Sequence, residues 1–344
     1  MKKIILIPAY KPDSTLTDLV SALSSHGLSV VVVDDGSGEK YRAVFDSAEE
    51  NAEIVHCAEN GGKGNALKKG IAYIRDNFSS PYIVVTADAD GQHTVEDILR
   101  VVESSARSPG SLVLGCRTIS REMPLRNWFG NVYTNVAFVF STGRKISDTQ
   151  TGLRGFSDKA VPFMLSIKGV RYEYEMNMLL WWMRCGKPIE EVPIRTLYFG
   201  EGGVSHFKAI RDSIVIYWNI LKFSTSSLIC FFIDTALFAL LFFTLPLCFA
   251  ARIFTANIAA RLITSVTHYL WLRFSSGKIP GCQKPSAPRY FLLAAAILAL
   301  NTVALWGLMS LGMAAVGAKV LVDVAFFFLT FAVQWRWFYK VKRK

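Results

Sequence analysis

Acidic residues are almost missing from the last third of this 344-residue chain. Residues 223–344 hold 12 of the 38 Lys and Arg residues but only two of the 27 Asp and Glu residues, a net charge of +10. That leaves a net charge of +1 for residues 1–222. A nucleic-acid-binding protein needs a basic face on its soluble part, so this class is excluded and no nucleic-acid partner is expected.

The chain also has no cysteine framework and no P-loop, and no signal peptide is expected in its first residues. Its six cysteines are scattered with no CxxC pair, which favours free thiols over structural disulfides. The apolar run after Met1 stops at Pro8 and is too short for a signal peptide, so we expect the N-terminus in the cytoplasm. The glycine-rich run at 60–65 lacks the Lys-Ser/Thr ending that a P-loop requires.

Long apolar runs are concentrated after residue 222, and they raise the hydrophobic content to 51%. Each of four runs is close to the ~20 residues that a membrane-spanning helix needs. They cover residues 224–248, 253–272, 290–311 and 319–338. The basic linker 273–289 and the basic C-terminal tail are both expected in the cytoplasm. The sequence therefore predicts an all-α membrane domain of four transmembrane helices at residues 223–344.

Residues 206–222 have the pattern of an amphipathic helix, with apolar side chains at helical spacing beside Lys and Arg. Such a helix lies in the membrane interface or packs as an ordinary core helix, and the apolar run that follows favours the interface. Three ionisable residues fall inside the predicted spans, where charge is costly: Asp234, Arg261 and Asp323. They indicate either an ion pair between Asp234 and Arg261 or a polar track for a lipid phosphate or sugar.

Residues 1–115 alternate short apolar runs with helical patterns. The runs are β-branched and end at turn residues, as buried strands do; they cover residues 3–7, 29–33, 53–57, 82–85 and 112–115. Helices are expected between them, at residues 14–25, 39–51, 63–77 and 95–107. This alternation predicts an α/β, Rossmann-like fold with a mostly parallel sheet, in which ligands bind beyond the carboxyl ends of the strands.

Polar residues follow three of these strands, and the pair Asp88 and Asp90 is the central observation. Carboxylates two residues apart in a loop can bind a hard cation together with a diphosphate, and Gln92 can add an amide oxygen. Such a cation neutralises the charge that develops on a departing nucleoside diphosphate. Residues 34–37 form either an Asp/Gly turn or a contact to a nucleotide. Lys63 begins a predicted helix, where it would face phosphate.

Taken together, these pieces resemble the family-2 glycosyltransferases with the GT-A fold, over about residues 3–205. The branch that makes polyprenyl-phosphate sugars, which includes dolichyl-phosphate mannose synthase, is the most similar. The resembling stretches are residues 7–10, 34–37, 62–67, 88–93, 115–117, 148–156 and 172–175. Residues 223–344 resemble the GtrA-like membrane domain, a softer likeness that depends on span count and the placement of polar residues. The resemblance therefore implies a glycosyltransferase domain at residues 1–205, an interfacial helix at 206–222 and a GtrA-like domain at 223–344.

The resemblance also implies roles for individual residues. Those expected to bind the nucleotide are Pro8, Ala9, Tyr10, Asp35, Lys63, Asp88 and Ala89. Mg²⁺ or Mn²⁺ would be held by Asp88, Asp90 and Gln92. Asp148 would position the sugar or a cationic partner, because a lipid phosphate is already ionised and needs no base. The candidates to bind the acceptor phosphate are Arg117, Arg126 and Arg154. Ser205 and His206 would close over the diphosphate, unless Ser205 is simply a helix N-cap.

The implied reaction is inverting transfer of a sugar from UDP or GDP to a polyprenyl phosphate, undecaprenyl phosphate in a bacterium. The enzyme would be a multi-pass protein of the bacterial cytoplasmic membrane, with its catalytic domain and C-terminus inside, and its oligomeric state stays open, a homo-oligomer included. Two alternatives remain: a lipid-linked sugar flippase that the soluble domain regulates, and a processive polysaccharide synthase. The synthase is disfavoured because the run at 334–337 has the wrong spacing for its Gln-x-x-Arg-Trp signature.

Overall fold

The computed structural model describes residues 1–117, 146–195, 228–276 and 286–338. It divides into two compact units, Met1–Ile220 and Leu221–Lys344, which are described separately below. The expected interfacial helix at residues 206–222 lies outside the described residues. The expected domain boundaries therefore stay a prediction.

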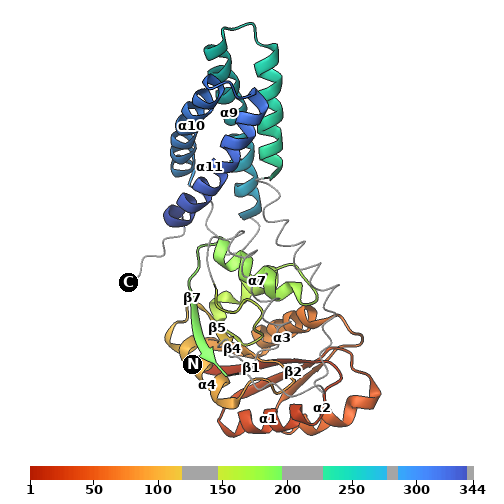
Figure 1. Ribbon diagram of the computed structural model, residues 1–344. Helices are drawn as coiled ribbons and strands as arrows, with labels where there is room; N and C mark the ends of the chain where they lie inside the picture. Colours follow the sequence, from red (N-terminus) through yellow and green to blue (C-terminus); the bar gives the residue numbers. More distant parts are fainter. Residues whose placement is uncertain (118–145, 196–227, 277–285, 339–344) are drawn as a thin grey trace. The chain divides into compact units, whose positions relative to one another are not determined.

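The first unit is built on a seven-stranded sheet with the order β3-β2-β1-β4-β6-β5-β7 (Figure 1). The strands are β1 Lys2–Ala9, β2 Ser29–Asp34, β3 Glu53–His56, β4 Tyr82–Thr86, β5 Leu112–Arg117, β6 Arg154–Ser157 and β7 Ile189–Ile194. The five strands expected from the apolar runs are confirmed, and β6 and β7 were not predicted. Only β6 runs antiparallel to its neighbours β4 and β5. Its first residues therefore lie at the same edge as the carboxyl ends of β1, β2, β4 and β5.

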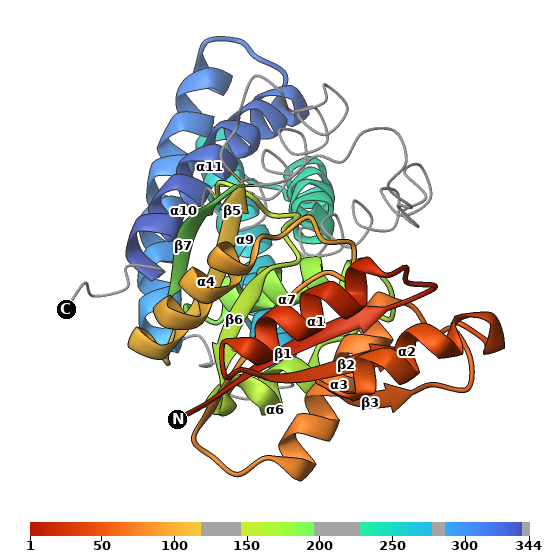
Figure 2. The same cartoon turned by 90° about the horizontal axis from the view of Figure 1, so that it is seen from below.

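Helices cover both faces of this sheet (Figure 2). One face carries α1 Thr15–Ser25, α2 Arg42–Glu49 and α4 Val95–Arg107. The other carries α3 Lys63–Asn77, α6 Val161–Ser166 and α7 Glu173–Arg184. Successive residues of a strand point to opposite faces, so a strand buried on both sides is a continuous apolar run. Ile4, Ile5, Leu6 and Ile7 are all fully buried for this reason.

The second unit is helical. Its helices are Leu228–Thr244, α9 Phe249–Ser276, α10 Ala287–Ser310 and α11 Ala315–Phe338. Each of the four predicted spans coincides largely with one of them. Within the described residues, α10 alone is long and apolar enough by length and composition to cross a membrane. The prediction of a helical domain is thus confirmed, whereas four membrane crossings remain a proposal.

Large apolar side chains are exposed mainly on the helical unit. Among the described residues, every exposed large hydrophobic side chain except Met1 and Val170 belongs to it. Phe232 and Phe243 are 63% and 68% exposed, and Leu292 is 64% exposed. An apolar surface of this extent is unfavourable in water and marks contact with lipid or another protein.

Candidate active site

The first polar segments of the site lie side by side because β1 and β2 are parallel neighbours. Ala9 pairs in register with Asp34, and the Asp35 amide donates to the Ala9 carbonyl at 2.9 Å. Asp34 accepts a hydrogen bond from the Ser37 amide at 2.8 Å, as an Asp-initiated turn does. Pro8 and Tyr10 are half-buried at this edge. The structure thus brings residues 8–10 and 34–37 together, at the place where ligands bind in open α/β sheets.

Asp35 organises the glycine-rich loop that leads into α3. Its two carboxylate oxygens accept hydrogen bonds from the amides of Gly61 at 2.9 Å and Gly62 at 2.7 Å. Gly62 has a φ of +90°, and a Cβ there would meet the Val170 carbonyl oxygen at 2.8 Å. Burial raises the pKa of Asp35, although both amide contacts and Lys69 oppose that rise. Asp35 therefore shapes the loop that presents Lys63, in addition to any contact with a nucleotide.

Lys63 stands between two carboxylates. Its Nζ lies 2.7 Å from Asp88 Oδ1 and 3.0 Å from Glu175 Oε2, and the three side chains are 18%, 28% and 10% exposed, respectively. Burial opposes the charge on Lys63, but the two carboxylates outweigh it and raise the pKa of the lysine. Burial likewise opposes ionisation of Asp88, but Lys63 and His93 lower the pKa of this carboxyl. Lys63 and Asp88 are therefore both charged at neutral pH. Glu175 was not assigned a role from the sequence.

Asp88, Asp90 and Gln92 follow β4 in one short loop. The Gln92 amide donates to Asp90 Oδ1 at 3.1 Å. Burial and the negative charge of Asp88 raise the pKa of Asp90. His93 is buried beside Asp88. Its Nε2 lies 3.8 Å from Asp88 Oδ2, which is too far for a hydrogen bond. The loop therefore offers two adjacent carboxylates that repel each other, an arrangement that a cation relieves.

A second loop, residues 148–154, lies directly against Asp88. A Cβ on Gly152 would meet Asp88 Oδ2 at 2.3 Å, so any larger residue there would displace the Asp88 carboxylate. The Thr86 hydroxyl at the end of β4 donates to the Gly152 carbonyl at 2.7 Å. These contacts bring the loop that contains Asp148 to the loop that contains Asp88 and Asp90.

Asp148 and Arg117 form a buried ion pair. Arg117 Nε lies 2.5 Å from Asp148 Oδ2, and its Nη2 lies 3.0 Å from Oδ1, a bidentate geometry. The Asp148 side chain is completely buried and that of Arg117 is 17% exposed. From the sequence, Asp148 was expected to position the sugar or a cationic partner. In this structure, its cationic partner is Arg117. The guanidinium is therefore fixed at the end of β5.

Arg154 does not fit the expectation that it binds the acceptor phosphate. It is 1% exposed, and its guanidinium donates to the carbonyl oxygens of Thr151, Glu175 and Thr149. Those contacts join the 148–154 loop to α7, because arginine can donate to several acceptors at once. The motif resemblance alone does not reveal this, since it gives no information about burial. Arg126, Ser205 and His206 lie outside the described residues.

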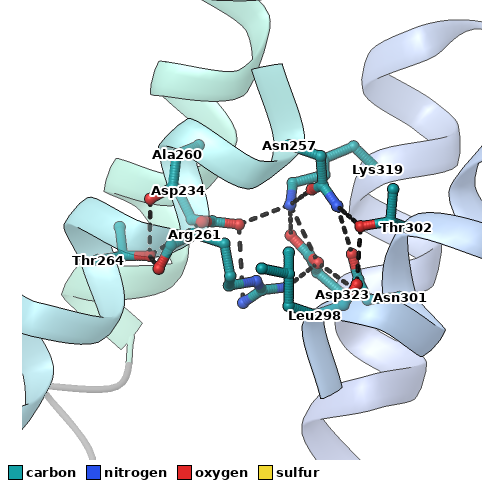
Figure 3. Close-up of polar contacts among 10 residues, drawn as sticks. All are labelled: Asp234, Asn257, Ala260, Arg261, Thr264, Leu298, Asn301, Thr302, Lys319 and Asp323. Atoms are coloured by element: carbon teal, nitrogen blue, oxygen red, sulfur yellow. Dashed lines mark hydrogen bonds and ion pairs between the residues drawn. The ribbon is translucent and has the colours of Figure 1, made fainter. Parts of the chain in front are cut away.

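The helical unit contains a cluster of four charged residues, three of them buried and Arg261 partly exposed, shown in Figure 3. Arg261 lies 3.7 Å from Asp234 and 2.5 Å from Asp323. Lys319 lies 2.6 Å from Asp234 and 3.1 Å from Asp323, and its side chain is completely buried. Two carboxylates thus face two cations. The three residues singled out from the sequence are brought together, and Lys319 is a fourth member that was missed.

Neutral polar groups complete this cluster. Lys319 also donates to Asn257 Oδ1 at 2.8 Å, and Asn301 donates to Asp323 at 2.9 Å. The hydroxyl of Thr264 donates to Asp234 at 2.9 Å. Buried charges are tolerated when they are paired and hydrogen-bonded in this way. The cluster has no net charge, so it favours the ion-pair interpretation over an open track for an anionic lipid.

Lys319→Met is expected to destabilise the helical unit strongly. It leaves Asp234 and Asp323 facing one guanidinium, and removal of one partner from a buried pair costs about 3–5 kcal/mol. Thermal unfolding of the detergent-solubilised protein measures the loss. The charge-balanced variant Lys319→Met/Asp323→Asn is expected to regain part of it. Equal stability of Lys319→Met and the unmodified protein would contradict a role for this charge in holding the helices.

Known proteins are similar to this chain over about half of its length. The sequence model of the family described as "Glycosyl transferase family 2" matches residues 4–164. It does not reach the helical unit, so the GtrA-like resemblance stays a prediction. The chain is 30% identical over 200 residues to an uncharacterized protein of Methanocaldococcus jannaschii, which covers 56% of this chain and 81% of that protein.

Two relatives have named activities. One is the UDP-N-acetylglucosamine–dolichyl-phosphate N-acetylglucosaminyltransferase of Methanococcus voltae, 27% identical over 215 residues, with 56% of this chain and 85% of the relative covered. The other is the undecaprenyl-phosphate mannosyltransferase of Micrococcus luteus, 29% identical over 211 residues, with 56% and 83% covered. Residues 4–164 are therefore a glycosyl transferase family 2 domain, as the family match shows.

Proposed function

We propose that the chain transfers a sugar from a nucleotide sugar to a polyprenyl phosphate, with a divalent cation bound at Asp88 and Asp90. The observation that carries the proposal is the convergence of Asp88, Lys63 and the 148–154 loop at the carboxyl edge of the sheet. A cation and an ammonium at one point of this edge suit a diphosphate, whose charge both would neutralise. Arg117 is the last residue of β5 and lies at the same edge of the sheet.

The residues present fit Mg²⁺ or Mn²⁺. Asp88 and Asp90 offer hard carboxylate oxygens, and Gln92 offers an amide oxygen from the same loop. No cluster of three or more His, Cys, Asp or Glu ligands occurs among the described residues. Mg²⁺ commonly binds through one or two carboxylates together with substrate phosphates, so a protein cage is not required. The cation would supply charge neutralisation to the leaving nucleoside diphosphate.

A polyprenyl phosphate acceptor agrees with the membrane character of the chain. The helical unit exposes large apolar side chains, and α10 is long and apolar enough to span a bilayer. The relatives from Methanococcus voltae and Micrococcus luteus carry dolichyl phosphate and undecaprenyl phosphate in their names. We place the chain in the bacterial cytoplasmic membrane, crossing it four times, with the catalytic domain on the cytoplasmic side. The acceptor phosphate oxygen would attack C1 of the sugar in line and invert it.

The test is to incubate the purified full chain with undecaprenyl phosphate, Mn²⁺ and a panel of UDP- and GDP-sugars, and to weigh the lipid product by mass spectrometry. A mass increase of one sugar with one of the donors is expected, and chelation of the cation is expected to abolish it. A polymeric product would indicate a processive synthase. Movement of a sugar lipid across vesicles without any transfer would indicate a flippase, and either result would overturn the proposal.

A further inference from the structure

Lys63, Asp88 and Glu175 come from three separate elements of the fold. Lys63 is the first residue of α3, Asp88 follows β4, and Glu175 lies in the first turn of α7. The lysine Nζ contacts both carboxylates, at 2.7 and 3.0 Å. Glu175 is 7% exposed, and nothing in the proposed chemistry yet uses it. A second carboxylate on a lysine that already has one requires an explanation.

The start of α3 is held firmly against α7. A Cβ on Gly64 would meet Tyr174 Cβ at 2.5 Å and the Arg171 carbonyl oxygen at 2.7 Å. The Asn65 amide donates to the Val170 carbonyl at 2.9 Å. The backbones that carry Lys63 and Glu175 are therefore fixed relative to each other. Lys63 can leave Asp88 and still keep Glu175.

A divalent cation on Asp88 competes with the Lys63 ammonium. Mg²⁺ binds oxygen ligands in proteins at about 2.0–2.1 Å, and the ammonium already contacts the Asp88 carboxylate that would be such a ligand. Two positive charges at one carboxylate repel each other, so the cation binds more tightly if the lysine withdraws. An ammonium has three donors, so a lysine retained by Glu175 keeps two of them for an incoming phosphate.

We propose that Glu175 is a positioning residue that retains Lys63 when the cation takes Asp88, so that the ammonium stays at the diphosphate. The inference rests on the proposed function, because it names what the lysine does in that site. Without the Glu175 charge, Asp88 is the one anionic contact that the described residues still offer the lysine, which then blocks the cation there. With it, the lysine exchanges Asp88 for the phosphate.

The experiment measures Mn²⁺ binding to the full chain by electron paramagnetic resonance, without nucleotide. Glu175→Gln is expected to weaken Mn²⁺ binding about tenfold. The substitution removes the charge-assisted contact of Glu175 with Lys63, which competes with Asp88 for the ammonium. Lys63→Met is expected to tighten Mn²⁺ binding, since the competitor is gone. Lys63→Met/Glu175→Gln removes both charges and leaves Asp88, the proposed cation ligand, without its ammonium partner. In the Lys63→Met background, Glu175→Gln is expected to change Mn²⁺ affinity by less than a third of the factor that it causes when Lys63 is present.

Glu173→Gln is the matched control, because Glu173 lies on the same turn of α7 and accepts from the amides of Val170 and Arg171. It is expected to leave Mn²⁺ binding unchanged. An equal effect of Glu175→Gln with and without Lys63 would mean that Glu175 attracts the cation directly, and the inference would be wrong. If the unmodified chain transfers sugar but the effects of Lys63 and Glu175 on Mn²⁺ binding are not coupled, this inference alone is refuted. Coupling without transfer by any donor refutes the proposed function alone.

Discussion

Asp90→Ala is expected to lower sugar transfer by at least about a thousandfold, because a cation that neutralises a leaving diphosphate contributes several kcal/mol to the transition state. The alanine variant keeps Asp88, but the cation loses one of its two carboxylates. Initial rates of lipid-linked sugar formation over a range of Mn²⁺ concentrations measure the effect. A smaller decrease that extra Mn²⁺ restores would still agree with a ligand role, whereas full activity at low Mn²⁺ would remove Asp90 from the cation site.

The fold is expected to survive this substitution. Asp90 accepts one hydrogen bond, from the Gln92 amide two residues away, and it follows β4 without belonging to the sheet. The matched control is Asp76→Ala, since Asp76 pairs on the surface with its neighbour Arg75 at 2.8 Å. Surface ion pairs of this kind contribute about 0–1 kcal/mol, so Asp76→Ala is expected to keep full transfer. A loss of transfer in both variants would point to general damage and not to the cation.

The sequence was sufficient to predict the first five strands because each is a short apolar run that ends at turn residues. Ile83, Val84 and Val85 are all fully buried, as expected for a strand covered on both faces. The strands β6 and β7 were missed for a physical reason. β6 has only four residues, Arg154–Ser157, and β7 contains Glu190, Glu191 and Pro193, so neither has the apolar run of a central strand. Their positions depend on pairing with β5.

The candidate site was predictable where its chemistry is local in sequence. Asp88, Asp90 and Gln92 share one loop, and that loop follows a strand whose carboxyl end is readily inferred. Contacts between distant residues were not predictable in this way. Lys63 and Glu175 meet across 112 positions of sequence, and Lys319 meets Asp234 across 85. Lys319 lies four residues before Asp323 in an apolar run. This spacing was the one local signal for its role, because residues four apart face each other on a helix.

Burial also separates two of the three arginines that the sequence offered as phosphate ligands. Arg154 is enclosed by carbonyl oxygens, Arg117 is paired with Asp148 and partly exposed, and Arg126 lies outside the described residues. A sequence motif records residue type and not the direction of a guanidinium. Of the two arginines that the structure describes, Arg117 is therefore the better candidate to bind the acceptor phosphate.

Asp148→Asn is expected to reduce sugar transfer about a hundredfold, because an active-site group displaced by about 1 Å can cost that factor. The asparagine can still accept one hydrogen bond from Arg117, but the bidentate pair at 2.5 and 3.0 Å is lost. The free energy of unfolding is expected to fall by about 3 kcal/mol as well, since Asp148 is completely buried and its substitution removes a carboxylate charge from the buried ion pair with Arg117. Rates must therefore be measured per folded molecule.

Asp97→Asn separates the loss of stability from the loss of positioning. Asp97 is 1% exposed, and it accepts from the Arg195 amide at 2.9 Å and contacts Arg100, not Arg117. Its substitution is expected to lower stability to a similar extent while transfer per folded molecule stays normal. The KM for polyprenyl phosphate is expected to increase in Asp148→Asn and in Arg117→Gln, but not in Asp97→Asn. If Asp148→Asn and Asp97→Asn have the same KM for the acceptor, Asp148 contributes only to the stability of the fold. It then does not position Arg117 for the acceptor phosphate.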